Sequence, residues 1–92
     1  MSDEDKEILK DRESKYGKRT EFFDTWGKMC VLMRLYAESS KRETIDEAHY
    51  HAMTMVLLKV LRSAFNPDLE DNYKDARNYI TIAEDCNKDE SS

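Results

Sequence analysis

Residues 44–68, which read TIDEAHYHAMTMVLLKVLRSAFNPD, decide the fold. Thr44 followed three residues later by Glu47 is a capping box, in which each side chain accepts a hydrogen bond from the other residue's backbone amide. Pro67 ends the helix, because the residue before a proline is pushed out of the helical region. A helix over about 45–65 is therefore predicted. Its apolar side chains cover more than one face, so we expect it to contact more than one neighbouring helix.

Helical periodicity continues on both sides of this stretch. Apolar residues recur at intervals of 4, 3, 4 and 3 in two further segments: Phe22, Trp26, Met29, Met33 and Tyr36, and Leu69, Tyr73, Ala76, Ile80 and Ala83. This spacing predicts amphipathic helices over about 20–39 and 69–86, the later one with Asp68 as its N-cap. Residues 3–16 are dense in charge and predict a shorter, mostly solvated helix, with Gly17 at its C-terminal cap.

These elements predict an all-α fold, a helical bundle of three long helices plus a shorter N-terminal helix, in one domain over 1–92. Residues 39–43 are read as a polar connection and residues 87–92 as a flexible tail. Gly27 weakens its helix, which suggests that another helix approaches closely there. Since the helices carry more apolar surface than one chain can cover, we expect a homo-oligomer that completes the bundle.

The charge distribution limits the partners that the chain can take. The formal net charge is −5, and residues 66–92 alone carry eight acidic side chains against three basic ones. Phosphate-driven binding needs a basic stripe, so general nucleic-acid binding is not expected. The acidic carboxyl-terminal region is instead a candidate docking surface for a basic protein partner.

Several signals bear on the compartment. Cys30 and Cys86 have no neighbouring metal-ligand pattern, and we interpret them as small buried residues rather than a disulfide. The charged amino terminus has no apolar segment typical of a signal peptide, and no run of the sequence is long and apolar enough to span a membrane. We therefore expect a cytoplasmic protein with no membrane contact.

Polar side chains gather on the two helices that flank Pro67. On the later helix they are Asp71, Asn72, Asp75, Asn78 and Tyr79. On the earlier helix, Lys59 and Arg62 interrupt a surface that is otherwise apolar. An antiparallel hairpin would place both cations beside the acidic residues of the later helix.

Three interpretations of this polar cluster are open. In the first, ion pairs from the cations hold the two helices of the hairpin together, with Arg62 bidentate to Asp75 or Asp71, and no cofactor is expected. In the second, Glu21, Asp71 and Asp75 hold Mg²⁺ while Lys59 and Arg62 bind phosphate groups. In the third, the polar edge docks a partner.

A family resemblance covers roughly residues 12–86. It is carried by Tyr16-Gly17, then Glu21 with Phe23 and Trp26, then Met55-Val56-Leu57-Leu58-Lys59-Val60-Leu61-Arg62, then Asn66-Pro67, Asp71-Asn72, Asp75 and Tyr79. These residues resemble a set of small phage and prophage proteins of uncharacterised function. The family's usual Asp-Ile-Ala-Gly-Tyr is replaced here by Asp75-Ala-Arg-Asn-Tyr79, so Asn78 occupies the position of the glycine.

That family is in turn faintly similar to the MazG-type nucleoside triphosphate pyrophosphohydrolases, which are all-α oligomers that hold magnesium with Glu-Glu-x-x-Glu and Glu-x-x-Asp motifs. In this sequence the second motif would be Asn72-x-x-Asp75, and Glu21 is the only acid near the place of the first. The leading hypothesis is a small phage-type accessory protein that binds a host or phage protein, or a nucleotide. The alternative is a MazG-like, metal-dependent pyrophosphohydrolase.

Overall fold

The computed structural model describes the backbone of residues 2–40 and 44–91, and all of their side chains except those of 13–16 and 89–91. It contains four helices: α1 (Asp3–Tyr16), α2 (Arg19–Glu38), α3 (Glu47–Phe65) and α4 (Glu70–Ser91). The described residues include no strand, so the predicted all-α class is confirmed.

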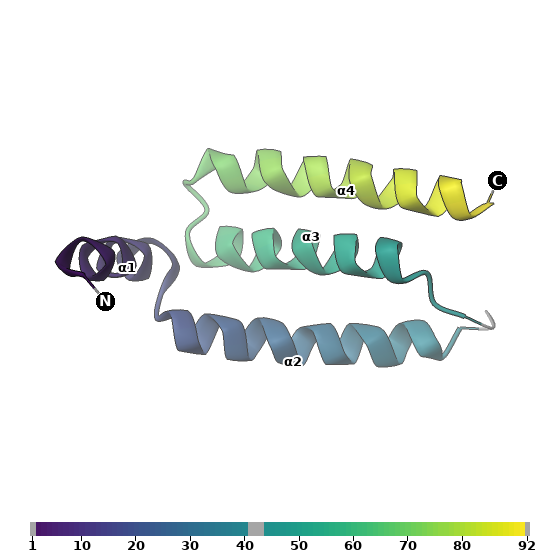
Figure 1. Ribbon diagram of the computed structural model, residues 1–92, viewed down its shortest axis with the longest axis horizontal. Coiled ribbons are helices and arrows are strands. Elements are labelled where there is room, and N and C mark those ends of the chain that lie inside the picture. Colours follow the sequence, from purple (N-terminus) through teal and green to yellow (C-terminus); the bar gives the residue numbers. More distant parts are fainter. Residues whose placement is uncertain (1, 41–43, 92) are drawn as a thin grey trace.

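The three long helices lie side by side in one layer, with α3 in the middle (Figure 1). α4 packs along α3 over the whole hairpin, whereas α2 touches the other side of α3 much less closely. α1 lies beyond the end of the layer, beside the start of α2, and the carboxyl terminus lies at the opposite end (Figure 1). Because α3 has a neighbour on each side, its apolar surface serves two helix contacts, as its sequence predicts.

The start of α3 differs from the expected capping box. Asp46 is the N-cap, and its carboxylate accepts a hydrogen bond from the backbone amide of His49 at 3.2 Å. Thr44 lies outside the helix, so the Thr44 capping box is wrong. The reason is that Asp46 stands three residues before the His49 amide, just as Thr44 stands three residues before the Glu47 amide. Aspartate caps helices at least as well as threonine.

The ends of α4 also differ from expectation. The helix begins at Glu70, two residues after the predicted cap Asp68, and Asn66 Oδ1 accepts a hydrogen bond from the Asp68 amide at 3.3 Å. At its other end α4 continues through the residues expected to form a tail and stops at Ser91. Polar residues with good helix propensity can extend a helix that is already nucleated. The connection predicted over 39–43 falls partly on residues 41–43, which lie outside the described residues.

α2 and α3 are linked by hydrogen bonds from a side chain of one helix to a backbone carbonyl of the other. Trp26 donates its indole N–H to the carbonyl of Thr54 at 2.9 Å, and the Tyr50 hydroxyl donates to the carbonyl of Cys30. Gly27 lies close by on α2, but a Cβ atom built there would meet nothing within 4 Å. The predicted close approach of another helix at Gly27 is therefore wrong for the described part of one chain, because no neighbouring helix comes within 4 Å of that position.

The core is small for a chain of this length. Among the described residues, the buried apolar side chains are Ala52, Val56 and Leu58 of α3 and Ala83 of α4. The radius of gyration is 15.7 Å, whereas a compact domain of this length has about 12 Å. None of the described helices is both long enough and apolar enough to cross a membrane.

Candidate functional site

The α3–α4 hairpin holds one ion pair between its polar residues. Lys59 Nζ lies 3.0 Å from Asp75 Oδ2. The lysine side chain is only 15% exposed, whereas that of the aspartate is 41% exposed. The hairpin therefore buries its cation more deeply than its anion. The Asp75 carboxylate offsets the cost of removing the Lys59 ammonium from water.

Arg62, which we expected to pair with Asp71 or Asp75, lies instead against α2. Its guanidinium carbon is 5.3 Å from the centre of the Phe22 ring, within the range of a cation–π contact. This contact is possible because Arg62, three residues after Lys59, falls about 60° short of a full turn and so sits nearer the side on which α2 packs. Lys59 takes the place that the sequence interpretation gave to Arg62.

The other members of the predicted polar edge are spread over different environments. Asn72 is buried, with 2% of its surface exposed, and its amide nitrogen has no hydrogen-bond partner within the described structure. Tyr79 is half-buried, while Asp71 and Asn78 are exposed. These residues therefore do not form one continuous polar surface.

The predicted magnesium ligands are not brought together. Glu21 lies exposed on α2, on a helix that does not pack against the α4 residues Asp71 and Asp75. Within the part of the chain that the structure describes, no group of three or more His, Cys, Asp or Glu side chains is placed to hold a metal ion. Mg²⁺ needs converging oxygen ligands, so these acids do not form the donor set that the pyrophosphohydrolase hypothesis requires.

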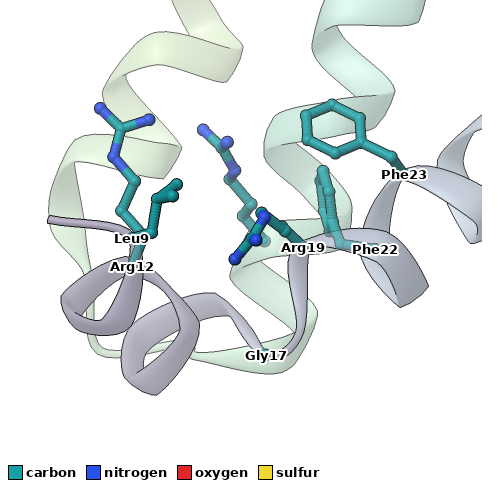
Figure 2. Close-up of a pocket in the computed structure, with 7 residues that line it drawn as sticks. Leu9, Arg12, Gly17, Arg19, Phe22 and Phe23 are labelled. Atoms are coloured by element: carbon teal, nitrogen blue, oxygen red, sulfur yellow. The ribbon is translucent and has the colours of Figure 1, made fainter. Parts of the chain in front are cut away.

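A different cluster forms where α1, α2 and α3 meet (Figure 2). A cavity of about 110 Å³ is lined by Leu9 and Arg12 of α1, Gly17 of the turn that follows, Arg19, Phe22 and Phe23 of α2, and Arg62 of α3. We call this the arginine pocket. Its lining combines three guanidinium groups with aromatic and aliphatic walls, and the described side chains that line it include no carboxylate. Such a combination suits an anionic group that carries an apolar part.

The turn at Gly17 creates this pocket. Gly17 has a φ of 81°, in the left-handed region that ends helices, as its predicted C-cap role requires. The turn folds α1 back, so that Arg12 faces the same cavity as Arg19 at the start of α2 (Figure 2). A Cβ atom at Gly17 would lie 3.0 Å from Phe65 Cε2, so the turn also packs closely on the end of α3.

No local pattern in the sequence points to Arg12 or Arg19 as site residues. The three arginines are separated by 7 and 43 positions and belong to three different helices. Only the fold brings them together. The one sequence signal available is Gly17, which marks a tight turn between two arginine-bearing helices.

At the other end of the layer, Arg34 of α2 binds Glu47 at the start of α3. The guanidinium donates to both carboxylate oxygens, with Nη2 to Oε2 at 2.9 Å, and also donates to Glu38 at 3.3 Å. The hydrogen bond from Arg34 lowers the pKa of the Glu47 carboxyl and raises that of the guanidinium. Burial raises the pKa of the nearby Cys30 thiol, which keeps it protonated, and both cysteines are free.

Comparison with curated proteins and with solved structures finds no match. A family model, described as a domain of unknown function (DUF6378), matches residues 1–87. That match covers α1, α2, α3 and α4 as far as residue 87, and it includes both the hairpin ion pair and the arginine pocket. The chain therefore belongs to the DUF6378 family.

Proposed function

We propose that this protein acts by binding a partner through an anionic group, and that the arginine pocket takes that group. The observation that carries the proposal is the convergence of Arg12, Arg19 and Arg62 on one cavity of about 110 Å³. Guanidinium groups bind phosphate and carboxylate by paired, planar hydrogen bonds, and several around one cavity strengthen the attraction.

The size of the cavity limits what enters it. At about 110 Å³ the cavity has room for a small group such as a phosphate or carboxylate. Arg12, Arg19 and Phe23 are exposed at its rim, so the rest of the partner can lie outside. The stacking of Arg62 on Phe22 holds one guanidinium in place before the anion arrives.

The wider role that we propose is that of a small accessory protein in the host cytoplasm, because the sequence resembles small phage and prophage proteins. We also propose that the chain works as a homo-oligomer. The wide apolar circumference of α3 and the small core of one chain support this part of the proposal.

The fluorescence of Trp26, the only tryptophan, tests the pocket directly. Its ring centre lies 6.0 Å from that of Phe23, which lines the cavity, so an anion that moves Phe23 changes the emission. The probes are inorganic phosphate, phenyl phosphate and adenosine monophosphate. We expect saturable binding that Arg12→Gln combined with Arg19→Gln weakens about tenfold or more.

The matched control is Arg77→Gln, because Arg77 lies exposed on α4 and does not line the pocket. It should leave the affinity unchanged while removing one positive charge. Binding that Arg77→Gln weakens as much as the pocket double variant would show only nonspecific attraction. No binding of any probe at millimolar concentration would overturn the proposal.

A further inference from the structure

The layer of three helices has two broad faces, and they differ in charge. The ion pairs that join the helices, Lys59 with Asp75 and Arg34 with Glu47, lie on one face. The other face carries six uncharged side chains, two from each helix, with Arg77 beside the last pair: Met29 and Tyr36, Met53 and Val60, and Tyr73 and Ile80. We call these six residues the apolar face.

The spacing of these residues places each pair on one side of its helix. Both members of every pair are seven residues apart, which is two turns of an α-helix. An apolar residue lies between the two members of each pair, three or four residues from each: Met33, Leu57 and Ala76, although on α4 the charged Arg77 also stands between Tyr73 and Ile80. Each helix thus presents an apolar stripe of the kind that packs against another helix.

The three stripes lie on the same side of the layer. A cavity of about 560 Å³ is lined by Met33 and Tyr36 of α2, Met53 of α3 and Asn87 of α4, among others. Asn87 stands seven residues beyond Ile80 and so continues the stripe of α4. This shallow space therefore runs across all three helices on the side of the apolar face, and no side chain that the structure describes fills it.

Most of the apolar face is exposed in a single chain. Tyr36 is 82% exposed and Ile80 51%, and Val60 and Tyr73 are also classed as exposed large hydrophobic residues. α2 and α4 flank α3 without closing over it, so no other helix of the chain is left to cover this side (Figure 1).

The total surface gives the size of the missing contact. The accessible surface is 7112 Å², whereas a compact monomer of 10.9 kDa has about 5,600 Å². The excess is about 1,500 Å² for each chain, and two chains that each buried it would form an interface of about 3,000 Å². That area is in the range of permanent homodimers, and it is about twice what a standard transient complex buries.

We propose that a second copy of this chain covers the apolar face, so that two three-helix layers pack face to face. This inference rests on the proposed self-association and names the surface that carries it. A second copy fits because it supplies an apolar face of the same size. The contact is isologous, so every substitution in it acts twice in one dimer.

Two isoleucines on α4 provide a matched pair of variants. Ile80 belongs to the apolar face, and Ile82, two residues later, lies about 200° further around the helix. Their exposures in one chain are nearly equal, at 51% and 48%. Ile80→Lys and Ile82→Lys therefore change charge, helix propensity and exposed area alike, and differ only in the face that they disrupt.

The experiment is sedimentation velocity and light scattering on the full chain over a series of micromolar concentrations. We expect the wild-type chain and Ile82→Lys to be dimers and Ile80→Lys to dissociate, with a dissociation constant raised about a hundredfold or more. Because a chain that loses its partner can unfold, Val60→Ala is the second variant. It keeps α3 helical and should raise the dissociation constant about tenfold by removing two buried methyl groups.

The outcomes separate the face from self-association itself. A wild-type chain that stays monomeric at every concentration overturns both the proposed self-association and this inference. A wild-type dimer that Ile80→Lys and Ile82→Lys weaken equally, or that Val60→Ala leaves unchanged, overturns only the assignment of the apolar face. Dissociation by Ile80→Lys alone supports it.

Discussion

The Lys59–Asp75 ion pair leads to a prediction that depends on which partner is buried. The lysine side chain is 15% exposed and the aspartate side chain 41% exposed, with Nζ and Oδ2 at 3.0 Å. Removing the carboxylate leaves an ammonium in a poorly hydrated place, whereas removing the ammonium leaves a carboxylate that water can reach. We therefore expect Asp75→Asn to destabilise the protein more than Lys59→Met.

The size of each effect follows from the same exposures. Exposed ion pairs contribute about 0.2–1 kcal/mol, and breaking a fully buried pair costs about 3–5 kcal/mol. The pair lies between these limits, so Asp75→Asn should lower the free energy of unfolding by about 2 kcal/mol. Lys59→Met keeps the aliphatic stem in place and should cost about 0.5 kcal/mol or less. The coupling energy from the double-mutant cycle should be about 1.5 kcal/mol.

The assay is urea unfolding followed by circular dichroism, with all four proteins at one fixed concentration because self-association also contributes to stability. Repeating the cycle in concentrated salt should reduce the coupling only partly, since a half-buried pair is screened less than an exposed one. The reasoning is refuted if Lys59→Met costs more than Asp75→Asn, or if the coupling energy is zero.

Three further predictions concern single residues. Gly17→Ala should lower the free energy of unfolding by about 1–2 kcal/mol, measured by urea unfolding, because alanine is strained at a positive φ and its Cβ would crowd Phe65; no loss would mean that the turn has another conformation. Asn72→Leu should leave stability unchanged or raise it by about 1 kcal/mol, since the buried amide nitrogen has no partner within the described structure; a large loss would reveal a hydrogen bond made by that amide. Glu47 has a pKa lowered by Arg34, so its stabilising effect is complete above the unfolded-state pKa of about 4.3 and disappears as the pH falls through the lower folded-state pKa; thermal melts of wild type and Glu47→Gln should therefore differ at neutral pH and converge in acid.

The helices themselves could be predicted from the sequence because their signals are local. The 4, 3, 4, 3 spacing places α2 and α4 correctly, and Gly17 ends α1 as expected. The errors lie at helix ends, where neighbouring residues compete for the same role. Asp46 and Thr44 are both good N-cap residues for α3 and stand only two residues apart. No feature of the sequence decides between them.

The candidate site was harder to predict because it depends on how far around α3 each side chain lies. Lys59 and Arg62 are three residues apart, which is nearly one turn, yet Lys59 contacts α4 and Arg62 contacts α2. A middle helix divides its surface between two neighbours, so a small angular difference changes the partner. The sequence shows that both cations interrupt an apolar surface, but it does not show which neighbour lies against each.

Periodicity also cannot tell a face that is covered within one chain from a face that a second chain covers. Trp26 and Tyr36 belong to the same 4, 3, 4, 3 series on α2, yet the Trp26 indole is bonded to α3 and the Tyr36 ring is almost fully exposed. The two side chains differ because Trp26 points toward α3, whereas Tyr36 lies on the face of the layer opposite the ion pairs. The ion pairs on one face and the three apolar stripes on the other therefore indicate where a second copy can bind, and this arrangement becomes visible only once the three helices are placed side by side.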